Sequence, residues 1–260
     1  MSTSITHAHA TTPLTKLILL ALVWLPIFGV ISAIFLLWNH WVNWVDLVLL
    51  FTMYAICGFG ITLGFHRMLT HKAFRAQPWL KTILLISGSM AMQGPALHWA
   101  ATHTQHHANS DDEGDPHSPL KSLWHAHVGW ILNDFKPDIQ KYAGAMLKDP
   151  IIVFIHNTFW LWVFAGLALP ALIGAGAAQL MGHSAWFGAL TGLIWGGFVR
   201  VCLRVSVCVC VCLCVSVSLC LCVSVSVCLS VFLSVCLSVS VYLSICLSVY
   251  LSICLSIFLS

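Results

Sequence analysis

Charged side chains are scarce in this sequence. Only 7% of its 260 residues are Asp, Glu, Lys or Arg, against roughly 25% in a typical soluble domain. Apolar residues make up 60% of the chain. The net charge of +3 is too small to indicate nucleic acid or another acidic partner. This composition excludes an ordinary soluble domain and indicates an integral membrane protein.

Glutamate and cysteine are also scarce outside the last part of the chain. Glu113 is the only glutamate, which excludes the soluble di-iron bundles whose ligands are Glu and Glu-x-x-His. Cys57 is the one cysteine before residue 202, and the other eleven lie in the region 201–260. Cysteine usage therefore says nothing about the redox compartment.

Four apolar segments are predicted as membrane-spanning helices. Residues 17–38 and 47–65 are uncharged, and each is long enough to cross roughly 30 Å of hydrocarbon. The short link between them is rich in Trp, a residue that favours the membrane–water boundary. Residues 151–169 are predicted as a third span and residues 185–199 as the start of a fourth. The apolar segment 83–97 is short, which predicts an interfacial or part-buried helix.

Positive charge is concentrated between the second and third spans. Eight of the eleven Lys and Arg residues lie between residues 66 and 150, and Lys16 precedes the first span. The links after the first span and before the fourth carry no Lys or Arg. The positive-inside rule then places the N-terminus and the 66–150 region in the cytoplasm. The predicted fold is all-α and membrane-embedded, with four spans in two hairpins and a cytoplasmic cap.

The region 201–260 differs from the rest of the chain. Its odd positions are Val, Leu or Ile, and nearly all its even positions are Ser or Cys. Such alternation predicts a strand, but strands are usually 3–10 residues long, and this region has no Gly, Pro, Asn or Asp to form turns. Repeated GTCT, read in triplets, encodes the Val-Cys-Leu-Ser found at 235–238. We interpret the region as a translated simple repeat that is not natively folded; an amyloid-like β segment is the alternative.

The chain is thus predicted to comprise a disordered N-terminus at 1–16, a membrane domain at 17–200 and this low-complexity tail. Within the membrane domain, glycines at 192–197 are expected to allow close helix contact. His156 lies inside the predicted third span, where an interhelical hydrogen bond is expected.

Two histidine clusters lie just outside apolar segments. His103, His106 and His107 have the spacing i, i+3 and i+4, so they share one face of a helix. His66 and His71 are five residues apart and would diverge by roughly 140° on an α-helix. They converge only if the helix ends between them, which is expected at the end of the second span.

Converging imidazoles indicate a transition-metal centre, because nitrogen ligands suit iron, zinc, copper and nickel. Five histidines exceed the needs of one tetrahedral zinc and suit two metals. Surface histidines of a polar loop and a zinc site remain the alternatives.

At this point the sequence resembles the membrane fatty acyl desaturases, especially the acyl-CoA delta-nine type. Residues 64–71, Gly-Phe-His-Arg-Met-Leu-Thr-His, look like the first histidine box of that family, and residues 103–111 look like the second. Residues 114–119 and 127–130 are similar to family sequences that follow it. The resemblance runs from about residue 15 to residue 200.

The resemblance implies an enzyme in which two non-haem iron ions activate O₂ and a cis double bond is formed in a fatty acyl chain, expected to be an acyl-CoA. Electrons would come from cytochrome b5 or a ferredoxin-like donor. The membrane would be the endoplasmic reticulum in a eukaryote or the inner membrane in a bacterium. The implied iron ligands are His66, His71, His103, His106 and His107. Residues expected to orient these imidazoles or to face the head group are Asp111, Asp115, His117 and His127.

The sequence departs from the family in two places. Thr104 stands where the family usually has Arg, which is expected to affect a supporting contact and not the metal. The family also has a third histidine box and, in the acyl-CoA type, a histidine on the fourth span, but no histidine follows His183 here. We therefore expect that the chain as written cannot assemble a complete di-iron centre. A related hydroxylase or alkane monooxygenase and a non-catalytic metal-binding membrane protein are the rival functions.

Overall fold

The structure is a computed structural model, and it describes residues 13–203 except 39–41, 111, 113, 117, 119, 123–124, 126–128 and 131–134. Helices are the only regular secondary structure among the described residues, so the all-α prediction is confirmed. Residues 1–12 and 204–260 lie outside the described part, and our interpretation of both ends stays a prediction.

Three helical segments are long and apolar enough to cross a membrane: Trp44–Thr70, Phe159–Leu180 and Ala185–Leu203. They are built from α2 (Trp44–Phe59) with η1 (Gly60–Thr70), from α8 (Phe159–Leu180), and from α9 (Ala185–Gly192) with η4 (Leu193–Val199). The predicted first span corresponds to α1 (Pro13–Trp38), which includes a shorter apolar helix at Trp24–Leu37.

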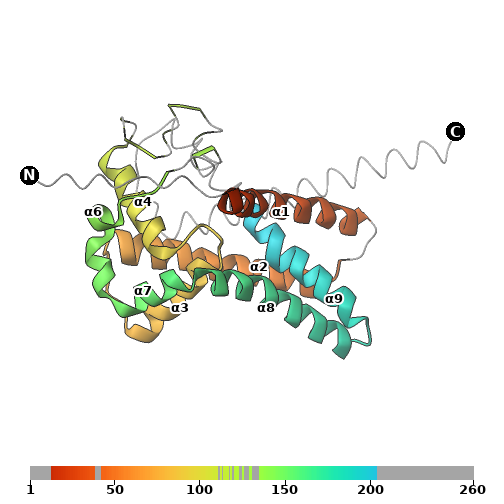
Figure 1. Cartoon of the computed structure of the whole chain (residues 1–260). Helices are drawn as coiled ribbons and strands as arrows, with labels where there is room; N and C mark the ends of the chain where they lie inside the picture. Colours follow the sequence, from red (N-terminus) through yellow and green to blue (C-terminus); the bar gives the residue numbers. More distant parts are fainter. Residues whose placement is uncertain are drawn as a thin grey trace, which may run out of the picture. The chain divides into compact units, whose positions relative to one another are not determined.

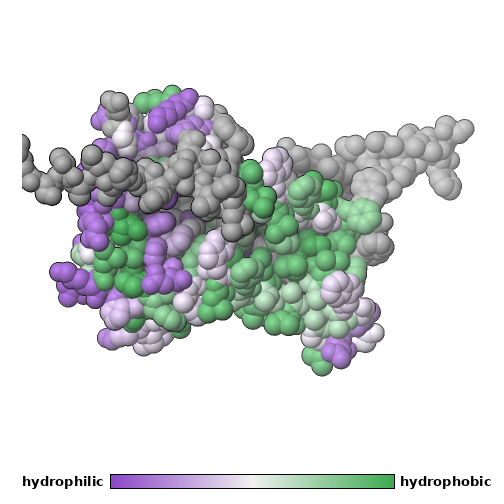
Figure 2. Space-filling model, in the orientation of Figure 1, coloured by the Kyte–Doolittle hydropathy of each residue, from purple (hydrophilic) through white to green (hydrophobic). Residues whose placement is uncertain are grey.

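The remaining helices form a cap at the end of α2 and η1 that carries the histidines (Figure 1). They are α3 (Pro78–Ser89), α4 (Ala96–Ala108), α6 (Ile139–Ala143), η3 (Gly144–Lys148) and α7 (Pro150–Asn157). Figure 2 shows hydrophilic residues over this end and hydrophobic residues over the spanning helices. The surface is therefore divided into a polar end and an apolar band, as expected for a membrane protein.

The predicted third span, 151–169, is wrong in its bounds. Helix α7 ends at Asn157, and the spanning helix α8 begins at Phe159. The side chain of Asp149 accepts hydrogen bonds from the first turn of α7 and pairs with Lys81 of α3, which holds the start of α7 among polar groups. The apolar side chains of Ile152 and Ile155 are buried in the core of the cap and not in lipid.

The predicted helix at 83–97 is also wrong in its bounds, because the segment contains a turn. Helix α3 ends at Ser89, and α4 begins at Ala96. Met92 and Gly94 between them have positive φ angles of 61° and 102°, and Pro95 disfavours helical backbone in the residue before it. The part-buried character was predicted correctly, since Leu84 and Leu85 belong to the cap core.

Small residues allow α8 and α9 to approach closely. A Cβ atom on Gly174 of α8 would lie 2.2 Å from the carbonyl oxygen of Gly188 of α9. A Cβ atom on Gly192 would lie 2.4 Å from the carbonyl oxygen of Pro170. Membrane helices use such contacts because lipid gives no hydrophobic drive for their association. The expected role of glycines in 192–197 is confirmed at Gly192 and at Gly196, which meets Pro170.

Candidate metal centre

The end of the second span widens into a π-helix, η1, which brings His66 and His71 together. The backbone N–H of His71 donates to the carbonyl oxygen of His66 at 3.0 Å, a bond that spans five residues. Residues five apart therefore stack along a π-helix, as residues four apart do along an α-helix. The two Nε2 atoms lie 3.1 Å apart. The helix ends at Thr70 with His71 as its C-cap, so the predicted end between the two histidines is confirmed; the π-helical winding before it was not predicted.

Helix α4 presents the second pair of imidazoles toward the first. His103 and His107 are one turn apart, and their Nε2 atoms also lie 3.1 Å from each other. The ring centroids of His66 and His103 are 4.8 Å apart, and those of His71 and His107 are 5.0 Å apart. One ligand atom from each of these four residues lies within 4.8 Å of all the others. We call this set the four-histidine site.

The four-histidine site has the dimensions of a single metal ion. Imidazole nitrogens bind zinc at about 2.1 Å, so two neighbouring ligands on one ion lie about 3.0 Å apart at a right angle and about 3.4 Å apart at a tetrahedral angle. The 3.1 Å separations within each pair lie between these values, whereas the 4.8 Å limit requires a small contraction. Nitrogen donors of this kind suit iron, zinc, copper or nickel. The side chains present therefore fit a transition metal.

Burial favours the neutral form of His103 and His107. Burial lowers the pKa of His103 to about 3, and the neighbouring His66, His107, His71 and His106 add to this effect. Burial, followed by the proximity of His71 and His106, also lowers the pKa of His107. A metal binds the neutral imidazole, so His103 and His107 are in the protonation state that a metal requires at neutral pH.

His106 does not belong to the four-histidine site. Its Nδ1 atom lies 2.9 Å from Oδ1 of Asp115, whose side chain is fully buried. Its ring is 5.8 Å from that of His107 and 6.4 Å from that of His103. Of the five predicted ligands, four converge and the fifth instead contacts a predicted supporting acid. The other predicted supporting residues, Asp111, His117 and His127, lie outside the described residues.

Trp99 forms one wall of the site and was not predicted from the sequence. Its ring stacks on that of His103 at 4.9 Å and lies edge-on to that of His66 at 6.3 Å. It also contacts Phe65, which is completely buried. The spacing of four residues between Trp99 and His103 on one helix was the available signal. The hydroxyl of Thr104 donates a hydrogen bond to the carbonyl oxygen of Ala100 in the same helix.

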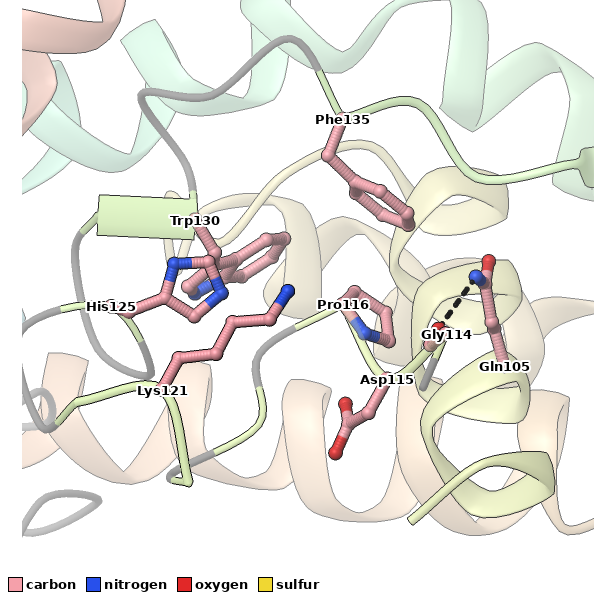
Figure 3. Close-up of a pocket in the computed structure, with 8 residues that line it drawn as sticks. All are labelled: Gln105, Gly114, Asp115, Pro116, Lys121, His125, Trp130 and Phe135. Atoms are coloured by element: carbon pink, nitrogen blue, oxygen red, sulfur yellow. Dashed lines mark hydrogen bonds between the residues drawn. The ribbon is translucent and has the colours of Figure 1, made fainter. Parts of the chain in front are cut away.

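A cavity of about 280 Å³ is lined by Gln105 of α4 and by residues of the segment that follows α4. Figure 3 shows the side chains of Lys121, Trp130 and Phe135 reaching into the space above Asp115 and Pro116. Gln105 closes one side and donates to the carbonyl oxygen of Gly114 at 3.1 Å. The cavity therefore combines one cation with aromatic rings beside the helix that carries the four-histidine site.

His156 caps the helix that carries half of the site. Its Nδ1 atom accepts a hydrogen bond from the backbone N–H of Leu97 at 3.3 Å. Leu97 is in the first turn of α4, where backbone N–H groups have no partner within the helix. The interhelical hydrogen bond expected of His156 is confirmed, although it lies in the cap and not in a span.

The stability of the fold should depend on pH through His156. Burial and the nearby His98 lower its pKa from 6.5 to about 4. Between these values the unfolded chain binds a proton that the folded chain does not, so this contribution to stability is complete above pH 6.5 and is lost as the pH falls toward 4. From pH 7 to pH 5 the Tm of the wild type should fall more steeply than that of His156→Gln, which keeps an acceptor but does not titrate. Parallel curves of Tm against pH would contradict this assignment.

Comparison with known proteins identifies the group to which this chain belongs. A family model described as "Fatty acid desaturase" matches residues 39–211, which include both histidine clusters. The chain belongs to the fatty acid desaturase family. Among the relatives of this desaturase-family chain are enzymes whose names give three different acyl carriers.

The chain is 39% identical over 189 residues to the hex-5-enoyl-(acyl-carrier protein) acetylenase of Moorena producens, covering 68% of this chain and 57% of the relative. It is 33% identical over 146 residues to the sn-1 stearoyl-lipid 9-desaturase of Anabaena variabilis, covering 55% and 48%. It is 36% identical over 159 residues to the acyl-CoA C20 Delta5-desaturase of Anemone leveillei, covering 59% and 46%. The chain therefore spans about half the length of these desaturase-family relatives.

Proposed function

We propose that this protein is a fatty acyl desaturase that uses O₂ to form a cis double bond, with iron held by His66, His71, His103 and His107. The observation that carries the proposal is the convergence of these four imidazoles at the polar end of a membrane bundle in a chain of the desaturase family. Iron bound there would supply the oxidising power to remove hydrogens from unactivated methylenes, chemistry that side chains alone do not perform.

The residues of the chain hold the metal and shape its surroundings. His66 and His103 are half-buried, while His71 and His107 are exposed. The site is thus closed toward the core, where Trp99 and Phe65 exclude water, and open toward the polar side. An acyl chain lying against the apolar wall would present its methylenes to the metal, while O₂ and electrons would arrive from the open side.

The partners and location follow from this arrangement as proposals. The polar end would face the cytoplasm, on the endoplasmic reticulum or on a bacterial inner membrane. Exposed Arg67 and Arg75 lie close in sequence to His66 and His71, and their charge suits an acidic electron donor such as cytochrome b5 or a ferredoxin. Lys121, in the cavity beside Asp115, supplies a positive charge for the acyl carrier, which we expect to be CoA.

We further infer that the 260-residue chain holds only one of the two iron ions that the family resemblance implies. Four histidines converge on one point, His106 contacts Asp115, and no histidine occurs in residues 184–260. Among the residues that the structure describes, a second ion would have His106 but too few further nitrogen ligands. The chain by itself should therefore not desaturate fatty acids.

A chimaera tests the proposed desaturase function separately from the missing ligands of the second iron ion. Residues 1–199 would be joined to the C-terminal part of the Moorena producens relative and expressed in a host without desaturase, and the fatty acids analysed by mass spectrometry. We expect products lighter by two hydrogens from the chimaera, and none from its His103→Ala variant or from the 260-residue chain. Products heavier by one oxygen would identify a hydroxylase instead. Unsaturated product from the 260-residue chain would refute the single-ion inference.

A further inference from the structure

Arg200 is a buried cation at the junction between the spanning helices and the cap. It follows η4 and is only 2% exposed. Its guanidinium donates to the carbonyl oxygen of Gly166 at 2.9 Å and to that of Met90 at 3.1 Å, and it contacts Sγ of Cys57. Charged side chains inside a membrane protein are costly and mark functional positions by default. The three contacts come from three different helical elements, so Arg200 joins four parts of the fold.

The carbonyl of Gly166 needs this donor because of a proline one turn later. In an α-helix it would accept a hydrogen bond from residue 170, but Pro170 has no N–H. An unsatisfied carbonyl in a membrane bundle costs several kcal/mol. Arg200 replaces the missing donor. The contact is close, since a Cβ atom on Gly166 would lie 3.1 Å from Nη2 of Arg200.

The carbonyl of Met90 needs a donor for a different reason. Met90 is the C-cap of α3, and the last carbonyl groups of a helix have no partner within it. The C-terminus of a helix also carries a partial negative charge, which a guanidinium complements. Arg200 therefore satisfies two backbone acceptors that the helices themselves leave open.

Both elements that carry the histidines follow, along the chain, residues that Arg200 contacts. Met90 starts the turn into α4, which carries His103 and His107, and Cys57 lies three residues before η1, which carries His66. We propose that Arg200 is a positioning residue: by tying α8, the end of α3 and α2 together, it sets the separation of α4 and η1 without touching the four-histidine site. The metal readout of this proposal rests on the proposed function, whereas its structural readouts do not.

The contact between Arg200 and the proline-broken turn is tested in metal-free protein by a double-mutant cycle. Arg200→Met should lower the Tm, followed by tryptophan fluorescence in detergent, by about 5–10 °C. In Pro170→Ala the helix regains a donor for Gly166, so adding Arg200→Met should cost clearly less. If Arg200→Met does not fold, Arg200→Lys, which keeps the charge, replaces it in the double-mutant cycle. Additive effects would show that Arg200 does not serve the carbonyl of Gly166, and would overturn the proposal.

The effect on the site is measured with Co²⁺, whose visible absorption reports ligand geometry. Arg200→Met should weaken Co²⁺ binding roughly 10- to 100-fold, the range found when groups supporting metal ligands are removed, and should alter the absorption bands. Lys148→Met, which removes an exposed cation of the cap, is the control and should change neither. Unchanged binding and bands in Arg200→Met would overturn the positioning role.

If the wild type binds no Co²⁺, the proposed function fails and hydrogen exchange decides the inference alone. Arg200→Met should then raise the exchange rate of backbone amides in α4, Ala96–Ala108, relative to the wild type and Lys148→Met. Equal rates would overturn the proposal.

Discussion

His107→Ala is expected to weaken metal binding by roughly 10²–10³-fold, whereas the neighbouring change His106→Ala should weaken it by less than about tenfold. Four-ligand zinc sites bind with about 10–16 kcal/mol, so one ligand contributes about 2.5–4 kcal/mol. Only His107 of this adjacent pair has a ligand atom in the four-histidine site. His106 contacts Asp115 instead.

The measurement is a Co²⁺ titration of purified protein, supported by metal content from mass spectrometry. The adjacent histidines form a matched pair, because both lie on the last turn of α4 and both changes remove the same number of atoms. Equal losses in the two variants would place His106 among the ligands and contradict the single site. A wild-type stoichiometry of two ions per chain would contradict it as well.

Gly60→Ala should destabilise the fold strongly, because two helices touch at this position. A Cβ atom on Gly60 would lie 2.1 Å from the backbone nitrogen of Gly88 in α3. The added methyl group would fit only if η1 moved away from α3, because the atom that it meets is part of the backbone. Overpacking of a rigid core costs about 1–3 kcal/mol, which corresponds to a fall in Tm of roughly 3–10 °C for a chain of this size.

Gly176→Ala is the control for this change, since nothing lies within 4 Å of a Cβ atom there and the residue is also inside a helix. Its Tm should equal or exceed that of the wild type, because alanine favours helix over glycine. Gly60→Ala should also weaken Co²⁺ binding, as His66 lies on the displaced helix. A wild-type Tm for Gly60→Ala would show that α3 and η1 are not in contact at this point.

The sequence alone predicted the helical class, the polar cap and the four histidines that converge, because each has a local signal; the fifth predicted ligand, His106, contacts Asp115 instead. Spacing on one helix was enough to pair His103 with His107. Hydropathy located the α2 and α9 spans well because they are largely apolar. Hydropathy placed the start of the third span too early in the sequence. The apolar side chains of Ile152 and Ile155 face a protein core, and hydropathy does not distinguish that core from lipid.

Features that depend on contacts between distant elements had no such signal. The π-helical winding of η1, which packs on α3, was not predicted; the five-residue spacing of His66 and His71 predicted only that the helix ends between them, as it does at Thr70. In the sequence, Arg200 is only the last residue before the tail. Its role had no local signal, because the carbonyl groups to which it donates lie 34 and 110 residues away. The separation of His106 from its neighbour His107 depends on a buried acid in the following loop.

The π-helical winding of η1 makes the number of residues between His66 and His71 matter more than their identity. Substitutions at intervening positions such as Arg67 leave the five-residue hydrogen bond in place, since that bond uses only the backbone. Losing or gaining one residue would rotate one imidazole away from the other by about a quarter of a turn. During divergence within the family, this segment should exclude insertions and deletions, while an exposed position such as Arg67 tolerates replacement.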